Sequence, residues 1–263
     1  MGTMNLNLPI GFRCAIFALC AACIQPALHS QAPPQKESLP RVPFVGCKSD
    51  GQEGALDAPT GSNQPVNVSA EQAQQLAYYK AEYGQGVLAP RGWNCFATYG
   101  SNGSNLYVSP QAIDVKNILT DRWKGFSGSA VQLTIEDGGT SGRFGIARAI
   151  ARVFPAHVDF AQKIIKEGIQ PASSFPSGPF PADKLTYKSK EIVEFETPAN
   201  TDGLGTESAL KKNADPIIGV LVLSNLSADV DLSRVTMRLP VNLASLSSAI
   251  IQAVEADAVS TGN

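Results

Sequence analysis

A continuous apolar run near the carboxyl end of the chain places the strongest constraint on the fold. It reads ADPIIGVLVLSNL, at residues 214–226, and it contains one strand's length of apolar side chains. A strand that is apolar on both faces needs other elements packed against both of them. The run therefore predicts the central strand of a sheet that is covered on both faces.

The segments around this run alternate as strands with one buried face do. In SAVQLTIED, at residues 129–137, apolar and polar residues alternate, and SRVTMRLP, at residues 233–240, places Val235, Met237 and Leu239 inward. Further strand patterns lie at residues 93–100, 106–110 and 184–196. These segments predict an antiparallel sheet of about six strands.

Helix patterns occupy residues 69–84, 140–154, 156–168 and 241–257. The first begins at a capping box of Ser69 and Gln72 and ends at Gly84, and the second has Thr140 or Ser141 as its N-cap. In the first helix, Tyr79 and Tyr83 would share a face that packs on the sheet. Together with the strands, the helices predict an α+β fold, a single domain whose antiparallel sheet is flanked by helices.

Length and composition are those of a folded protein. The chain has 263 residues, of which 43% are hydrophobic and 17% are charged, so it is able to bury a core. Its formal net charge of −2 comes from 21 Lys and Arg against 23 Asp and Glu, without a basic run interleaved with aromatic residues. A nucleic-acid partner is therefore not expected.

The amino terminus has the pattern of a secretory signal peptide. CAIFALCAACI, at residues 14–24, is an apolar segment too short for a stop-transfer helix, and a Pro/Gln stretch follows it. We predict a signal peptide at residues 1–30, cleaved after Ser30, and export to the periplasm or the extracellular space. Lipidation at Cys23 is an alternative processing route. The mature chain has no other segment that is long and apolar enough to cross a membrane.

Three regions follow the predicted cleavage site. Residues 31–68 are a lead rich in Pro and Gly, residues 69–256 form the α+β domain, and residues 257–263 are expected to fray. The lead contains one cysteine and the domain contains another, so a disulfide would tie the two regions together.

Cysteine and histidine counts restrict the chemistry. Of the five cysteines, three lie in the predicted signal peptide, which leaves Cys47 and Cys95. In an oxidising compartment these two would form one disulfide. His157 is the single histidine after residue 30, so no metal site built on several histidines is expected, and no cofactor is predicted.

Ser127 lies in KGFSGSAVQL, at residues 124–133, which resembles the nucleophile motif of a serine hydrolase. Trypsin-like enzymes have Asp before the nucleophile, and here Phe126 occupies that position. The nucleophile elbow Gly-x-Ser-x-Gly becomes Gly-x-Ser-x-Ser, and the motif precedes a strand instead of joining a strand to a helix. The segment favours a turn into a strand, while Ser127, with His157 as a base, remains a weak catalytic candidate.

Glu191 is a second weak catalytic candidate. Strict alternation from Leu185 to Phe195 places its carboxylate on the apolar face, where it could act as a tuned acid. A β-bulge near Ser189 and Lys190 would instead return it to solvent, and this is the favoured interpretation.

Two sets of residues are candidates for ligand binding. Arg143 lies beside the loop DGGTSGR at a helix start, an arrangement typical of anion sites, and Arg148 follows on the same helix. The alternative is that these arginines pair with surface carboxylates. The aromatic residues of the second set could line a binding surface or pack in the core; they are Trp93, Tyr99, Tyr107 and Trp123.

The aromatic region also carries a family resemblance. Pro90-Arg91-Gly92-Trp93, answered by Leu106-Tyr107-Val108-Ser109-Pro110, resembles the opening of a PsbP-like α/β sandwich domain over about twenty residues. The resemblance implies an antiparallel sheet flanked by helices, with binding or assembly roles. More loosely, the chain is similar to exported bacterial proteins that have no assigned activity.

Three hypotheses for the function follow. The first is a non-catalytic exported protein that binds a partner protein or a small ligand, since no complete catalytic constellation is visible. The second is a secreted hydrolase that uses a serine or a carboxylate, and the third is a structural subunit of an envelope complex.

Overall fold

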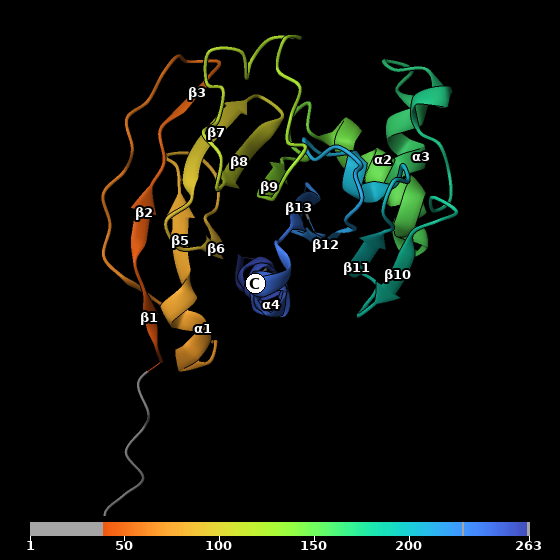
Figure 1. The fold of residues 1–263 in the computed structure, drawn as a ribbon. Coiled ribbons are helices and arrows are strands. Elements are labelled where there is room, and N and C mark those ends of the chain that lie inside the picture. The colour runs from red at the N-terminus through yellow and green to blue at the C-terminus, as the bar shows by residue number, and fades with distance from the viewer. Residues whose placement is uncertain (1–38, 228, 262–263) are drawn as a thin grey trace, which may run out of the picture. The chain divides into compact units, whose positions relative to one another are not determined.

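The computed structural model describes residues 39–227 and 229–261 (Figure 1). The predicted signal peptide, Cys23 and residues 31–38 of the predicted lead lie outside the described residues. The helices are α1 (Ala70–Gln75), α2 (Arg143–Val153), α3 (Val158–Lys166) and α4 (Ser247–Thr261), with the 3-10 helices η1 (Pro155–His157), η2 (Ala172–Ser174), η3 (Leu204–Thr206) and η4 (Val241–Leu246). The strands are β1 (Arg41–Val42), β2 (Phe44–Gly46), β3 (Ser49–Gly51), β4 (Gln64–Pro65), β5 (Leu76–Lys80), β6 (Val87–Pro90), β7 (Asn94–Gly100), β8 (Gly103–Ser109), β9 (Ala130–Glu136), β10 (Lys184–Tyr187), β11 (Ile192–Thr197), β12 (Ile217–Ser224) and β13 (Asp231–Arg238).

Eight strands form the largest sheet, in the order β10-β11-β12-β13-β9-β8-β7-β3. Neighbouring strands are antiparallel except β3 and β7, which are parallel. The predicted α+β fold is confirmed, but the sheet has eight strands instead of the predicted six or so, and one of its strand pairs, β3 and β7, is parallel. Residues 184–197 form two strands joined by a turn instead of one bulged strand, and β3 adds an edge strand from a segment without a strand pattern.

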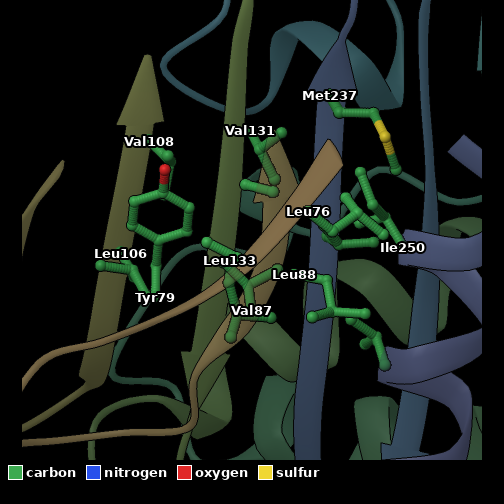
Figure 2. Close-up of a cluster of buried hydrophobic side chains, with 14 of the residues drawn as sticks. Leu76, Tyr79, Val87, Leu88, Leu106, Val108, Val131, Leu133, Met237 and Ile250 are labelled. Carbon is green, nitrogen blue, oxygen red and sulfur yellow. The ribbon is translucent and has the colours of Figure 1, made fainter. Parts of the chain in front are cut away.

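One face of this sheet packs against α4 and against the three-stranded sheet β2-β5-β6. Figure 2 shows part of the core between these layers. Leu133 and Met237 come from the large sheet, Leu76 and Leu88 from β5 and β6, and Ile250 from α4. All five are at most 2% exposed, so the part of this face that they cover is closed to solvent.

The opposite face carries two apolar clusters. In the first, Ile146 of α2 packs with Val193 of β11 and Leu221 of β12. In the second, loop residues such as Phe126 pack on Tyr107 of β8. Both faces of β12 are therefore covered, as the apolar run at residues 214–226 predicts.

The predicted disulfide is confirmed. Cys47 and Cys95 are bonded at a sequence separation of 48 residues. Cys47 follows β2 and Cys95 lies in β7, so the bond ties the amino-terminal segment to the large sheet.

The predicted helix at residues 69–84 is wrong after its first turns. Ser69 and Gln72 form the expected capping box, but α1 ends at Gln75. The following residues form β5, which is parallel to β2 and antiparallel to β6. There the Tyr79 side chain is fully buried, and its hydroxyl donates to the Pro90 carbonyl at 2.8 Å. Pairing and burial in the sheet outweigh the local helix propensity of these residues.

The sequence also predicts two properties of the helices: the residue at which α2 begins and whether a helix could cross a membrane. Gly142 is the N-cap of α2 and makes no side-chain hydrogen bond, so the prediction of Thr140 or Ser141 as the cap is wrong. Within the described ranges, no helix is both long enough and apolar enough to cross a membrane.

Candidate functional site

Three polar side chains of β13 are buried on the face opposite Val235 and Met237. Arg234, Thr236 and Arg238 are 8%, 1% and 2% exposed. Strand alternation alone would leave this face to solvent, but residues 203–213 cover it and contact both arginines through backbone carbonyl groups. A buried charge needs partners, because burial removes its hydration. This polar face is therefore the first candidate for a functional site.

Side chains of β8 and β9 continue the polar face. Asn105, Thr134 and Arg234 are paired side by side across β8, β9 and β13. Gln132 Nε2 donates to Asn105 Oδ1 at 3.1 Å and to Thr134 Oγ1 at 2.9 Å, and Thr134 Oγ1 donates to Asn105 Oδ1 at 2.7 Å. The Ala209 N–H donates to Gln132 Oε1 at 2.8 Å. The network uses the oxygen of Asn105 twice and leaves its Nδ2 amino group without a partner among the described residues.

A second set of hydrogen bonds holds η3 above the sheet. Thr197 Oγ1 donates to Asp183 Oδ1 at 2.7 Å, and the Leu204 N–H donates to Asp183 Oδ2 at 2.8 Å. The Gly205 N–H donates to Thr197 Oγ1 at 2.9 Å. Glu207, the residue that follows η3, is thereby positioned next to Arg234.

The Arg234 guanidinium makes few hydrogen bonds with the described residues. Its Nη1 lies 3.9 Å from Glu207 Oε2 and donates to the Glu207 carbonyl at 3.5 Å, which is a long hydrogen bond. Its Nε is buried and has no hydrogen-bond partner in the described part of the chain. An unsatisfied buried donor destabilises the fold by about 1–3 kcal/mol, more when it is charged. The guanidinium is thus held out of water with unused hydrogen-bonding capacity.

Glu136 contributes an acceptor to the same region, where Arg234 contributes donors. It lies two residues after Thr134 on the same face of β9, and its neighbours across the strands are Gly103 and Leu232, which offer it no side-chain donor. No hydrogen bond or ion pair reaches its carboxylate from another described residue. Gly145 of α2 lies directly against the carboxylate, and a Cβ atom at that position would collide with it.

Burial raises the pKa of Glu136. Arg234 and Arg148 lower the pKa of this carboxyl, and Glu207 adds to the increase. Desolvation is the largest of these effects, because a carboxylate loses its hydration in a mostly buried position. A perturbed carboxyl beside unused donors is characteristic of binding and catalytic sites.

These groups line a cavity of about 330 Å³. Its walls come from β8, β9, β13, α2, Glu207 and Asn102 of the turn before β8, and they include Ser104 and Arg148. Because the Arg148 side chain is exposed, the cavity reaches the surface there. Its volume falls at the lower end of the range for small-molecule sites, roughly 300–1,000 Å³. We call this space the Glu136–Arg234 cavity.

Arg238 explains the turn around Ser127. Its Nη1 donates to the carbonyls of Ser127 (3.4 Å) and Gly128 (3.1 Å), and its Nη2 donates to that of Lys211 (2.5 Å). Asn213 Nδ2 also donates to the Ser127 carbonyl at 2.7 Å. The Ser127 hydroxyl makes no hydrogen bond to any described residue, so the fold holds this serine through its backbone.

The structure brings His157 and Glu191 together. His157 Nε2 lies 3.4 Å from Glu191 Oε1 without hydrogen-bond geometry, and Ser189 Oγ donates to Glu191 Oε2 at 3.0 Å. Glu191 lies in the turn between β10 and β11, so neither the strict alternation nor the predicted bulge describes its position. In a Ser-His-Glu triad the histidine lies between serine and carboxylate. Here the serine bonds the carboxylate, so the group does not have that arrangement.

The four aromatic candidates lie in three places. Tyr107 and Trp123 are in edge-to-face contact, with centroids 5.1 Å apart, in the cluster around Phe126. Trp93 packs against the buried cluster that contains Tyr79 and Leu133. Tyr99 contacts Tyr83, with centroids 4.8 Å apart. The aromatics therefore do not line one shared surface, and the prediction that they bind a ligand stays a prediction.

The two candidate arginines differ. Arg143 donates from Nε and Nη2 to Glu167 Oε2 at 3.2 and 3.1 Å, and from Nη1 to the Thr140 carbonyl at 2.8 Å, so its donors are engaged within the fold. Arg148 lines the Glu136–Arg234 cavity and donates to Gln170 Oε1 at 3.4 Å. Among the described residues, no three His, Cys, Asp or Glu side chains are grouped as a metal site requires.

Sequence reasoning missed the main residues of this site, Arg234, Glu136 and Asn105. One signal was present, since two arginines in SRVTMRLP share a strand face with Thr236. A polar strand face usually indicates solvent, and the cover that buries it comes from residues distant in sequence.

Comparison with known proteins adds no assignment. The chain matches none of the known family models, curated proteins or solved structures to which it was compared. The function must therefore be argued from the chemistry of the Glu136–Arg234 cavity.

Proposed function

We propose that this is an exported protein that binds a small polar molecule in the Glu136–Arg234 cavity and releases it unchanged. The observation that carries the proposal is Arg234, a residue more than nine-tenths buried that lines a cavity and whose Nε has no hydrogen-bond partner among the described residues. A ligand acceptor would satisfy this donor, and such charge-assisted hydrogen bonds are the strong ones. The Cys47–Cys95 disulfide and the signal-like amino terminus support export.

Binding is expected to depend on Arg234. We expect the wild-type protein to bind at least one compound from a panel of amino acids, sugars and organic acids, measured by ligand-observed NMR and calorimetry. In Arg234→Met the affinity should fall at least tenfold, because truncating a buried charged partner removes about 2–5 kcal/mol or more of binding energy.

The matched control is Arg122→Met, which removes the same charge from an exposed loop residue. This control should bind as the wild type does. Equal affinities in all three proteins would place binding elsewhere, and an absence of binding across the panel would contradict the proposal.

A second candidate function, a carboxylate-dependent hydrolase, has one supporting observation. Glu136 and Glu207 face the same cavity, and burial raises the pKa of Glu136, as general acids require. NMR of the bound compound over several hours separates the two functions. An unchanged ligand supports binding, and a cleaved ligand supports hydrolysis.

Glu136→Gln is expected to stabilise the empty protein at neutral pH. Burial raises the pKa of Glu136 in the folded state above its ordinary value of 4.5, so ionisation disfavours folding. The penalty is absent below pH 4.5, grows as the pH rises toward the folded-state pKa, and is constant above it. The melting temperature of the variant relative to wild type should therefore increase from pH 4 to pH 8.

Glu82→Gln, at an exposed position, is the control for this measurement and should show no such trend. A Glu136→Gln variant that is destabilised to the same extent at every pH would contradict the expectation. That result would mean that the carboxylate is already satisfied in the fold.

A further inference from the structure

The unused hydrogen-bonding groups of the cavity are divided by type. Two donors have no partner among the described residues, Arg234 Nε and the Asn105 amino group, and both belong to the row of residues that crosses β8, β9 and β13. The Glu136 carboxylate, an acceptor without a hydrogen bond from any described residue, lies two residues after Thr134 on β9. Two strand residues span about 7 Å. The cavity therefore offers unused donors at one end, where the Glu207 carboxylate lies 3.9 Å from Arg234 Nη1, and the Glu136 carboxylate at the other end, a short distance away.

Charge is also balanced around the cavity. Arg234 and Arg148 contribute two positive groups, and Glu136 and Glu207 contribute two negative ones. Arg148 is exposed and the Glu207 side chain is partly exposed, whereas Arg234 is buried and Glu136 is partly buried. A ligand with a net charge would leave Arg234 or Glu136 without a compensating charge, which is unfavourable away from water. A ligand with no net charge but with two separated charges would match both ends.

We infer that the ligand is a free α-amino acid, whose carboxylate accepts hydrogen bonds from Arg234 and Asn105 and whose ammonium group donates to Glu136. This inference rests on the proposed function and specifies its ligand class. An arginine fork suits a carboxylate because it donates two parallel hydrogen bonds. The small volume of about 330 Å³ agrees with a single amino acid. In a peptide the two charges lie further apart, so the same site discriminates against peptides.

Gly145 supports the role of Glu136. A side chain at this position would push the carboxylate away from the wall that α2 forms. Alanine is otherwise favourable in a helix. Gly145→Ala is therefore a way to displace the carboxylate without removing it.

The carboxyl–ammonium contact makes binding depend on pH. The charged groups that face Glu136 are Arg234 of β13, Arg148 of α2 and Glu207 after η3. Burial raises the pKa of Glu136 in the empty site, and a bound ammonium group lowers it, so binding releases a proton at low pH. The affinity should fall by up to tenfold per pH unit below the pKa of the empty site.

Calorimetric titration of the full chain with each of the twenty standard amino acids tests the inference. The best-binding amino acid is then compared with its carboxamide, which lacks the carboxylate, with its 2-hydroxy acid, which lacks the ammonium group, and with glycylglycine. We expect each of the three analogues to bind at least tenfold more weakly. Arg234→Met, Glu136→Gln and Gly145→Ala should weaken amino-acid binding by a similar factor, and Glu136→Gln should abolish its pH dependence.

Three outcomes overturn the inference in different ways. If glucose or succinate binds in an Arg234-dependent manner and no amino acid does, the ligand class is wrong and the proposed function stands. If no compound binds, both are wrong. Amino-acid binding that all three variants leave unchanged would also overturn the inference, because it would place the amino acid outside this cavity.

Discussion

Replacing Arg238 with methionine is expected to lower the free energy of unfolding by about 3 kcal/mol, since hydrogen bonds to a charged group contribute roughly 1.5–3 kcal/mol each. Arg238 donates to the carbonyl groups of Ser127, Gly128 and Lys211 from a position that is 2% exposed. Asn213 Nδ2 would still donate to the Ser127 carbonyl. The carbonyl groups of Gly128 and Lys211 would therefore account for most of the lost stability. Chemical denaturation of both proteins measures the difference.

Arg122→Met is again the matched control, and its stability should equal that of the wild type. A loss below 1 kcal/mol in Arg238→Met would mean that water replaces the guanidinium at the carbonyl groups. In that case the turn around Ser127 would not depend on Arg238.

Removing the disulfide is expected to have the largest effect on stability. The bond closes a loop between residues separated by 48 positions, and the chain-entropy relation gives about 4 kcal/mol for a loop of this length. We expect the Cys47→Ala, Cys95→Ala double variant to lose about this much in denaturant titrations. The variant should also become more sensitive to proteolysis within residues 48–68, because this segment loses its covalent tie.

Reduction of the wild-type protein provides the control for this prediction. The reduced wild type and the double variant should have the same stability, since both lack the same bond. A double variant as stable as the oxidised wild type would show that strand pairing alone fixes the amino-terminal segment, through β2 with β5 and β3 with β7.

The sequence predicted best those strands whose apolar pattern follows directly from which of their faces are buried. The run at residues 214–226 forms β12, which packs against α4 on one face and against the cluster that includes α2 on the other. The alternation at residues 129–137 forms β9, with Val131 and Leu133 in the core. Side chains of a strand alternate between its two faces. A strand with one buried face therefore has alternating apolar residues, and a strand with two buried faces has a continuous apolar run.

Prediction failed where distant pairing overrides local preference. Residues 76–80 belong to a segment rich in helix formers, yet they form β5 because β2 and β6 both pair with it. Propensity differences of a few tenths of a kcal/mol per residue are small beside the burial of Tyr79 and Leu76. Similarly, residues 188–191 form a turn, which splits one expected strand into β10 and β11.

By itself, the sequence determined the fold class, the central strand and the pairing of Cys47 with Cys95, because the apolar pattern and the two cysteines after residue 30 each allow few arrangements. Only the tertiary structure decided the candidate site. Arg234 and Glu136 occupy strand positions that read as solvent-facing, and residues 203–213 and α2, distant in sequence, bury them. Burial is what turns their ordinary charges into unsatisfied donors and acceptors, and no local pattern encodes which distant segment supplies the cover.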